Sequence, residues 1–210
     1  MLQTEQIRTV MCGTYQENAY LVCPDGRTDA FIVDPGDDLD RLRRALDDSG
    51  RTLAAILLTH GHFDHTLAAE PLQKQTGAPV YVHPADAQML RDADRCAWDP
   101  TICRLPLPSG AVVTAYPDTL SVCGETLRVL ATPGHSQGSV CLYEPDGGIL
   151  FSGDTLFRAG YGRTDLFGGS DADMVHSLIS LLKTLPEDTR VYSGHGAPTT
   201  IGLERGRYRL

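Results

Sequence analysis

Residues of two metal-binding types, histidine and aspartate, stand at the ends of four apolar segments. The first segment, AILLTHGHFDH (55–65), holds three of the seven histidines of a 210-residue chain, with an aspartate among them. The other segments are VLATPGHS (129–136), ILFSGDTLF (149–157) and VYSGHG (191–196). The candidate ligands are His60, His62, Asp64, His65, His135, Asp154 and His195. Ligand residues at four strand ends predict one assembled metal site, because strand ends present side chains on a rigid scaffold.

The spacing in the first segment favours two metal ions over one. His60 and His62 are two residues apart, so in an extended chain their side chains point to the same side. Asp64 and His65 come at the start of the next expected helix and face another direction. Imidazole and carboxylate ligands suit Zn²⁺, Fe or Mn, and the lack of cysteine ligands argues against a closed structural zinc site.

Each candidate by itself has a simpler interpretation. A single histidine is more often a hydrogen-bonded polar group than a ligand, and an aspartate after a strand is usually a cap or turn residue. Five histidines and two aspartates at four strand ends are poorly explained by chance. The remaining two histidines lack this context: His83 precedes Pro84 at a strand-to-helix junction and His176 lies within a predicted helix, so both are expected to be structural or surface residues.

The elements that must position these residues follow from hydrophobic periodicity and turn residues. Strands are predicted at 7–11, 19–23, 30–34, 53–59, 79–83, 126–132, 139–144, 148–153 and 189–194. Helices are predicted at 38–49, 65–76, 84–93 and 171–183, and residues 95–120, rich in proline, are expected to form an irregular surface excursion. Two halves of strands and helices predict two sheets packed face to face with helices outside.

Composition is that of one globular domain, residues 1–210. The net charge of −9 argues against a broad phosphate-binding surface, so no nucleic-acid partner is expected. No apolar run approaches the roughly 18–20 residues that span a bilayer, and the N-terminus shows no secretory signal pattern. None of the six cysteines forms a CxxC pair. Buried reduced thiols in a cytoplasmic protein are therefore expected.

The motif THGHFDH resembles the HxHxDH motif of the metallo-β-lactamase superfamily. The histidine of TPGHS, the aspartate of SGDTLF and the histidine of SGHG match the later ligand motifs of that family, in order. The resemblance spans essentially the whole chain and implies a four-layer αββα sandwich, an α/β fold with the site at strand ends between the sheets. It implies two divalent ions per chain, Zn²⁺ first and Fe or Mn as alternatives. The implied ligands are His60, His62 and His135 for one ion, Asp64, His65 and His195 for the other, and Asp154 as a bridge.

Within the superfamily, the chain resembles the single-domain members of the glyoxalase II-like branch, the hydroxyacylglutathione hydrolases. The matching phrases are GTYQENAYLV (13–22), FIVDPGD (31–37), GDTLFRAGYGRTD (153–165) and GHGAPTTIGLER (194–205). The resemblance implies a thioesterase that cleaves S-acyl thiol conjugates such as S-lactoylglutathione with a metal-bound hydroxide, which Asp64 would orient. Full-length glyoxalase II has a further C-terminal helical domain that helps bind glutathione, and this chain is expected to lack it. Arg163 is the first candidate for contact with an anionic thiol carrier, and Arg158 is the second.

Other functions stay open at this point. The persulfide (sulfur) dioxygenases resemble the chain closely, including GRTD (162–165), and use one Fe(II) that His60, His135 and Asp154 would hold here. Another hydrolase of this fold would act on a lactone, a β-lactam or a phosphodiester. A metal-binding module without enzymatic activity is a third alternative. The expected partner is a small-molecule thioester, and no association with a membrane is expected. The metal, the acyl group, the thiol carrier and the oligomeric state are left open.

Overall fold

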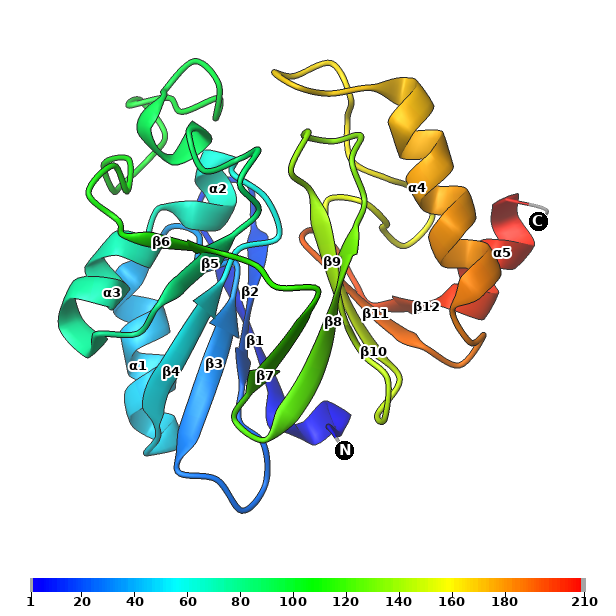
Figure 1. Cartoon of the computed structure of the whole chain (residues 1–210). Helices are drawn as coiled ribbons and strands as arrows, with labels where there is room; N and C mark the ends of the chain where they lie inside the picture. Colours follow the sequence, from blue (N-terminus) through cyan, green and yellow to red (C-terminus); the bar gives the residue numbers. More distant parts are fainter. Residues whose placement is uncertain (1, 209–210) are drawn as a thin grey trace.

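Two six-stranded sheets form the middle of the computed structural model, which describes residues 2–208 (Figure 1). The first sheet holds β1 (Ile7–Cys12), β2 (Glu17–Val22), β3 (Asp29–Val33), β4 (Thr52–Leu57), β5 (Val80–Val82) and β6 (Val113–Ala115) in that order. The second holds β12 (Thr199–Thr200), β11 (Arg190–Ser193), β10 (Ile149–Gly153), β9 (Val140–Glu144), β8 (Glu125–Ala131) and β7 (Thr119–Val122). The helices are α1 (Leu39–Ser49), α2 (Phe63–Thr66), α3 (Ala69–Thr76), α4 (Asp171–Thr184) and α5 (Ile201–Tyr208).

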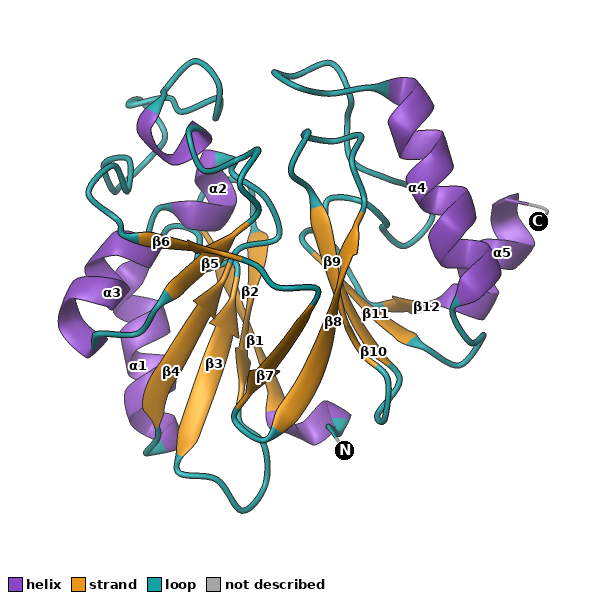
Figure 2. Ribbon diagram, in the orientation of Figure 1, coloured by secondary structure: helices purple, strands orange, loops and turns teal. Residues whose placement is uncertain are grey.

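Helices cover the outer face of each sheet, with α1 and α3 on one side and α4 and α5 on the other (Figure 2). The alternation along β3 shows how the layers arise: Phe31 packs in the core between the sheets, whereas Ile32 packs against α1 and α3. Phe151 of β10 belongs to the same central core, and its neighbour Leu150 packs against α4. Strands buried on both faces appear in the sequence as continuous apolar runs. The predicted four-layer αββα sandwich is therefore confirmed.

Strand direction brings the expected ligand-bearing ends to one edge. In the first sheet β3 and β4 are parallel. In the second sheet β10 and β11 are parallel, and β8 has the same direction because both β8 and β10 pair antiparallel with β9. Backbone hydrogen bonds join the two sheets at this edge, from the Val140 N–H to the Thr59 carbonyl and from the Asn18 N–H to the Gly194 carbonyl, each 2.8 Å. The loops after these strands therefore meet.

Three sequence-based predictions of elements were wrong. The expected helix at 84–93 is a series of turns with a short 3₁₀ helix, Met89–Arg91, because its hydrogen bonds connect residues three apart and the Asp86 side chain is buried. The excursion at 95–120 contains β6 and the start of β7, whose alternation is too short to recognise. The helix expected at 65–76 is divided into α2 and α3. Among the helices of residues 2–208, none combines the length and apolarity needed to cross a bilayer.

Candidate metal centre

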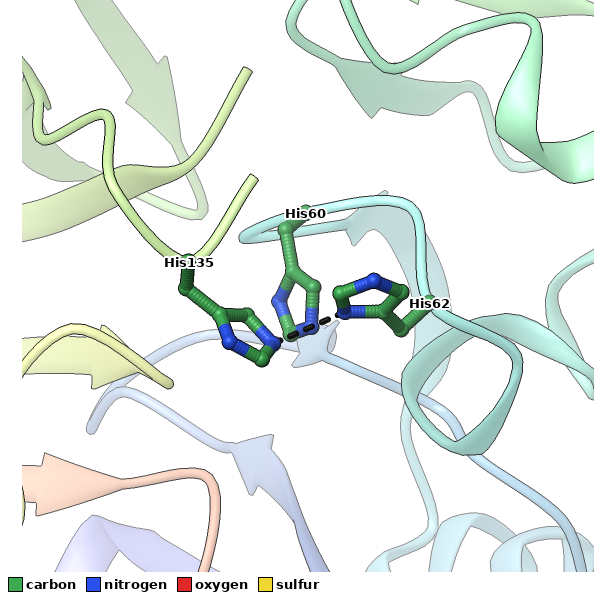
Figure 3. Close-up of side chains that lie close together, drawn as sticks. All are labelled: His60, His62 and His135. Carbon is green, nitrogen blue, oxygen red and sulfur yellow. Dashed lines mark hydrogen bonds between the residues drawn. The ribbon is translucent and has the colours of Figure 1, made fainter. Parts of the chain in front are cut away.

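The first cluster consists of three buried histidines from two loops. His60 and His62 follow β4, and His135 follows β8. Their candidate ligand atoms all lie within 4.8 Å of one another, and Nδ1 of His62 is 2.8 Å from Nε2 of His135. Figure 3 shows the three rings turned toward a common point. Three buried imidazoles that converge in this way form a typical binding site for a divalent transition metal.

The second cluster lies beside the first and contains Asp64, His65 and His195, whose candidate ligand atoms also lie within 4.8 Å of one another. His65 belongs to α2, and His195 follows β11. Nε2 of His195 is 3.3 Å from Oδ2 of Asp64. A ring contact between the two clusters, with the His60 and His65 ring centroids 4.2 Å apart, places them within one site.

Asp154 lies between the two clusters. One carboxylate oxygen, Oδ1, is 3.3 Å from Nε2 of His65, and the other, Oδ2, is 3.5 Å from Nε2 of His135 and 3.6 Å from Nε2 of His195. Its position matches that of a ligand shared by two ions. All seven residues singled out from the sequence are therefore close together.

In three of the rings, Nδ1 forms a hydrogen bond with a neighbouring oxygen. Nδ1 of His135 donates to the Arg163 carbonyl at 2.7 Å, and Nδ1 of His195 donates to the Tyr15 carbonyl at 3.2 Å. Nδ1 of His65 donates to Oδ2 of Asp34 at 3.1 Å. These bonds fix the protonated nitrogen of each ring, so that Nε2 carries the free lone pair that a metal ion needs.

His60 is oriented by the same logic through a hydroxyl group. The Thr59 hydroxyl donates to Oδ2 of Asp34 at 2.6 Å, so its oxygen accepts a hydrogen bond from Nδ1 of His60, 3.0 Å away. Asp34 thus positions both His60 and His65. Although its carboxylate lies near these rings, it already accepts from Thr59 and His65, so we interpret it as an orienting residue and not as a ligand.

Several buried atoms of the site lack hydrogen-bond partners within residues 2–208. They are the Nε2 atoms of His60, His62 and His65 and Oδ1 of Asp154. Buried polar groups are almost always paired, and an unpaired one marks strain, a missing ion or catalysis. Lone pairs of imidazole and carboxylate directed at common points fit divalent ions, so these residues suit the metals that the sequence predicts.

The charges of the site respond to burial and to one another. Burial, together with the neighbouring His135, lowers the pKa of His62 to about 3, and burial also holds the pKa of His60 well below its usual range. Burial opposes ionisation of Asp64 and Asp154, but His65 outweighs it and lowers the pKa of both carboxyls. For His65, burial is outweighed by these two carboxylates, which raise its pKa. Asp64 and Asp154 are therefore ionised carboxylates at the site, which suits cation binding.

Sequence reasoning missed two buried carboxyl groups beside the centre. Asp34 ends the phrase FIVD after β3, so an acidic residue at a strand end was a usable signal. Glu17 gave no signal, because it stands at the start of β2 and is fully buried there. Its Oε1 is 3.8 Å from Nδ1 of His65, and burial raises its pKa well above the usual range.

A cleft of about 320 Å³ opens over the two clusters. It is lined by Asp64, Asp154 and three of the histidines, His62, His135 and His195. Its walls include the apolar or aromatic side chains of Tyr15, Phe63, Phe157 and Leu166. Arg163, the first candidate for contact with a thiol carrier, lines the cleft. Arg158, the second candidate, is exposed and is not among the lining residues. The arrangement can hold a small substrate with one polar, reactive group at the metal site and apolar groups against the walls.

Comparison with known proteins agrees with this geometry. Residues 12–195 match the family model described as the metallo-beta-lactamase superfamily. The chain is 37% identical to the probable metallo-hydrolase YqgX of Bacillus subtilis over 206 residues, which cover 94% of this chain and 93% of YqgX. It is 30% identical to the hydroxyacylglutathione hydrolase GloC of Haemophilus influenzae over 208 residues, covering 95% and 94%.

Three solved structures share the fold along most of their length. They are the BLEG-1 B3 metallo-beta-lactamase (38% identity, TM-score 0.84, 95% of this chain and 96% of that one), TTHA1623 in a di-iron-bound form (41%, 0.83, 94% and 96%) and ETHE1 from Myxococcus xanthus (29%, 0.76, 95% and 81%). The His/Asp clusters and the di-iron-bound neighbour together support a site for two metal ions.

Proposed function

Because the chain belongs to the metallo-β-lactamase superfamily, we propose that this metallo-hydrolase is a thioesterase that cleaves S-acyl thiol conjugates such as S-lactoylglutathione. The observation that carries the proposal is the pair of ligand clusters, joined through Asp154, on the floor of a cleft with apolar walls. The similarity to GloC, a hydroxyacylglutathione hydrolase, supports this substrate class.

We assign the first ion to His60, His62 and His135 and the second to Asp64, His65 and His195, with Asp154 shared. Zn²⁺ is the ion we propose, with Fe and Mn as alternatives for the same ligand types. Divalent ions held there would supply hydroxide from water near neutral pH and a Lewis acid for the carbonyl oxygen of the substrate.

Asp64 is the residue that we propose to orient the attacking water. It lines the cleft, and its lowered pKa keeps the carboxylate ionised at neutral pH, so that an oxygen can accept a hydrogen bond from the water. No side chain is needed as a general acid, because a thiol with a pKa near about 8.5 leaves as the thiolate. The apolar walls receive the carbon skeleton of a small-molecule thioester. The cysteine pattern of the sequence leads us to propose the cytoplasm as its location.

Release of thiol from S-lactoylglutathione by protein purified without added metal tests the proposal, alongside metal analysis and a β-lactam as the competing substrate. We expect two ions per chain and thiol release. His60→Ala and Asp154→Ala should reduce both metal content and turnover by at least about 100-fold, since each removes a ligand. His176→Ala, which changes an exposed histidine on α4, is the matched control and should leave both unchanged. Unchanged turnover in either ligand variant would contradict the assignment.

A second candidate, a persulfide dioxygenase with one Fe(II), is favoured by the contact between Oδ2 of Asp154 and Nε2 of His135, 3.5 Å apart, with His60 beside them. These three side chains make up a 2-His-1-carboxylate set. The equally well assembled second cluster is the reason that we prefer the hydrolase. One iron per chain with oxygen uptake on glutathione persulfide, and no thiol release, would select the dioxygenase.

A further inference from the structure

A buried aspartate outside the ligand set joins the two loops that carry the first cluster. Asp86 lies in the turns that follow β5 and is only 1% exposed. Its Oδ2 accepts hydrogen bonds from the Gly61 N–H at 3.0 Å and from the Ser136 hydroxyl at 2.5 Å. Its Oδ1 accepts one from the Gly138 N–H at 2.7 Å. One carboxylate thus connects the loop at Gly61 and the loop at 136–138 to the turns that contain Asp86.

Two of the three partners of Asp86 are immediate neighbours of ligands. Gly61 stands between His60 and His62, and Ser136 follows His135. The first loop follows a strand of one sheet and the second loop follows a strand of the other, so Asp86 connects the two sheets at the metal site. The two oxygens of the carboxylate accept hydrogen bonds from three donors, and all three donors belong to the loops and not to the rings.

The two glycines that Asp86 contacts have no room for a side chain. A Cβ at Gly138 would lie 2.6 Å from Oδ1 of Asp86, and a Cβ at Gly61 would lie 2.9 Å from the Asp86 backbone oxygen. The close approach of both loops therefore depends on glycine and on the carboxylate that fills the space between them. Charge-assisted hydrogen bonds to buried backbone donors are among the stronger ones in proteins.

We propose that Asp86 is a positioning residue for the first metal ion: it fixes the two loops so that His60, His62 and His135 converge. The three histidines come from loops with no direct covalent link, and the 2.8 Å separation of Nδ1 of His62 and Nε2 of His135 requires both loops in register. Asp86 is the carboxylate that sets that register. The role holds whichever reaction the ions serve, so it does not depend on the thioesterase proposal.

The test measures metal affinity separately for the two clusters, with Zn²⁺ alone as the probe and a chromophoric chelator as competitor. A His195→Ala background isolates the first cluster, and a His62→Ala background isolates the second. We expect Asp86→Asn, which puts an amide group against N–H or O–H donors, to weaken Zn²⁺ binding to the first cluster by roughly 10- to 100-fold. Binding to the second cluster should change by less than about threefold, because none of its ligands adjoins Gly61, Ser136 or Gly138 in the chain.

Glu144→Gln is the matched control, because Glu144 is also a buried carboxylate that accepts two backbone hydrogen bonds, from Asp146 at 2.9 Å and Gly147 at 2.7 Å. Glu144 is the last residue of β9, next to the turn that leads to β10. The substitution should lower the melting temperature without changing either affinity. If Asp86→Asn does not fold, Ser136→Ala removes one of the three contacts and should weaken the first cluster alone. An unchanged first cluster, or equal losses at both clusters, would overturn the proposal.

Discussion

The Arg163 guanidinium reaches the wall of the cleft, but Asp165 already binds it. Nε and one terminal nitrogen of Arg163 each donate to a different oxygen of Asp165 at 2.7 Å. The hydrogen bonds from Arg163 lower the pKa of Asp165 to about 2, so the partner is ionised at neutral pH. An anionic thiol carrier must therefore compete with Asp165 for this arginine. Both side chains are well exposed, so the competition takes place in water, where such pairs are weak.

We predict that Asp165→Asn lowers KM for S-lactoylglutathione by about two- to fivefold and leaves kcat unchanged, since the freed guanidinium meets the carboxylates of the carrier. Steady-state kinetics with this substrate and with an uncharged thioester checks the prediction, because the uncharged substrate should show no gain. Arg158→Gln is the control and should have no effect on either substrate, because Arg158 does not line the cleft. A gain of equal size on both substrates would show that charge is not the cause.

The last helix, α5, contacts the turn that follows Phe157, a residue that lines the cleft. Glu204 of α5 is fully buried, and its Oε2 accepts a hydrogen bond from the Ala159 N–H at 3.0 Å. Its Oε1 accepts one from the Thr199 hydroxyl at 2.5 Å. Ala159 belongs to the turn after Phe157, whose ring lies 6.1 Å from the His195 ring. A carboxylate on α5 thus determines where an aromatic wall residue lies.

Replacing Glu204 should therefore affect stability and substrate binding more than chemistry. Glu204→Ala leaves two donors unpaired and should lower the free energy of unfolding by about 1–3 kcal/mol. It should raise KM, while kcat changes little because no ligand is moved. Urea unfolding and steady-state kinetics measure the two effects. Glu187→Gln changes an exposed carboxylate that is paired with Arg205 of α5. This control should alter neither stability nor KM. A fall in kcat without a change in KM would contradict this positioning role.

The helix that was predicted at 84–93 but is absent from the structure shows where local sequence patterns fail to predict an element. Its residues have helical spacing and Pro84 suits a first turn, but Asp86 is drawn into the site by donors from two distant loops. The turn hydrogen bonds that result, such as Asp86 N–H to the His83 carbonyl, replace a helix. A tertiary contact thus overrode local propensity. Longer elements such as α1 and α4 were predicted nearly to their ends, because their burial pattern repeats over several turns.

The buried centre of the molecule contains opposite charges together with neutral histidines. The stability of the metal-free protein should therefore depend on pH. The pKa values of His60 and His62 in the folded state lie below the unfolded value of 6.5. For His62 the folded-state pKa is about 3. The unfolded chain therefore binds protons that the folded chain does not, and stability is lost as the pH falls from 6.5 toward 3. The raised pKa of His65 acts in the other direction: its contribution is present below pH 6.5 and is lost as the pH rises through the folded pKa.

Urea unfolding with a chelator present at pH 7 and at pH 4.5 tests this balance. We predict lower stability at pH 4.5, since two histidines resist protonation there and each pKa unit corresponds to about 1.4 kcal/mol at full effect. His62→Asn removes one of these groups and should reduce the loss. A pH dependence that is unchanged in His62→Asn would contradict the assignment of the loss to that ring.

The sequence by itself determined which residue types stand at which strand ends, and hence the metal chemistry, the family and the layered fold. Periodicity and ligand types are local properties, so they can be read without contacts. The tertiary structure decided how His62 and His135, 73 residues apart, come within 2.8 Å. It also decided that Asp86 and Glu204 matter. Their roles depend on hydrogen bonds to the loops at 61 and 136–138 and to Ala159, which are distant in the chain, and no local pattern encodes such bonds.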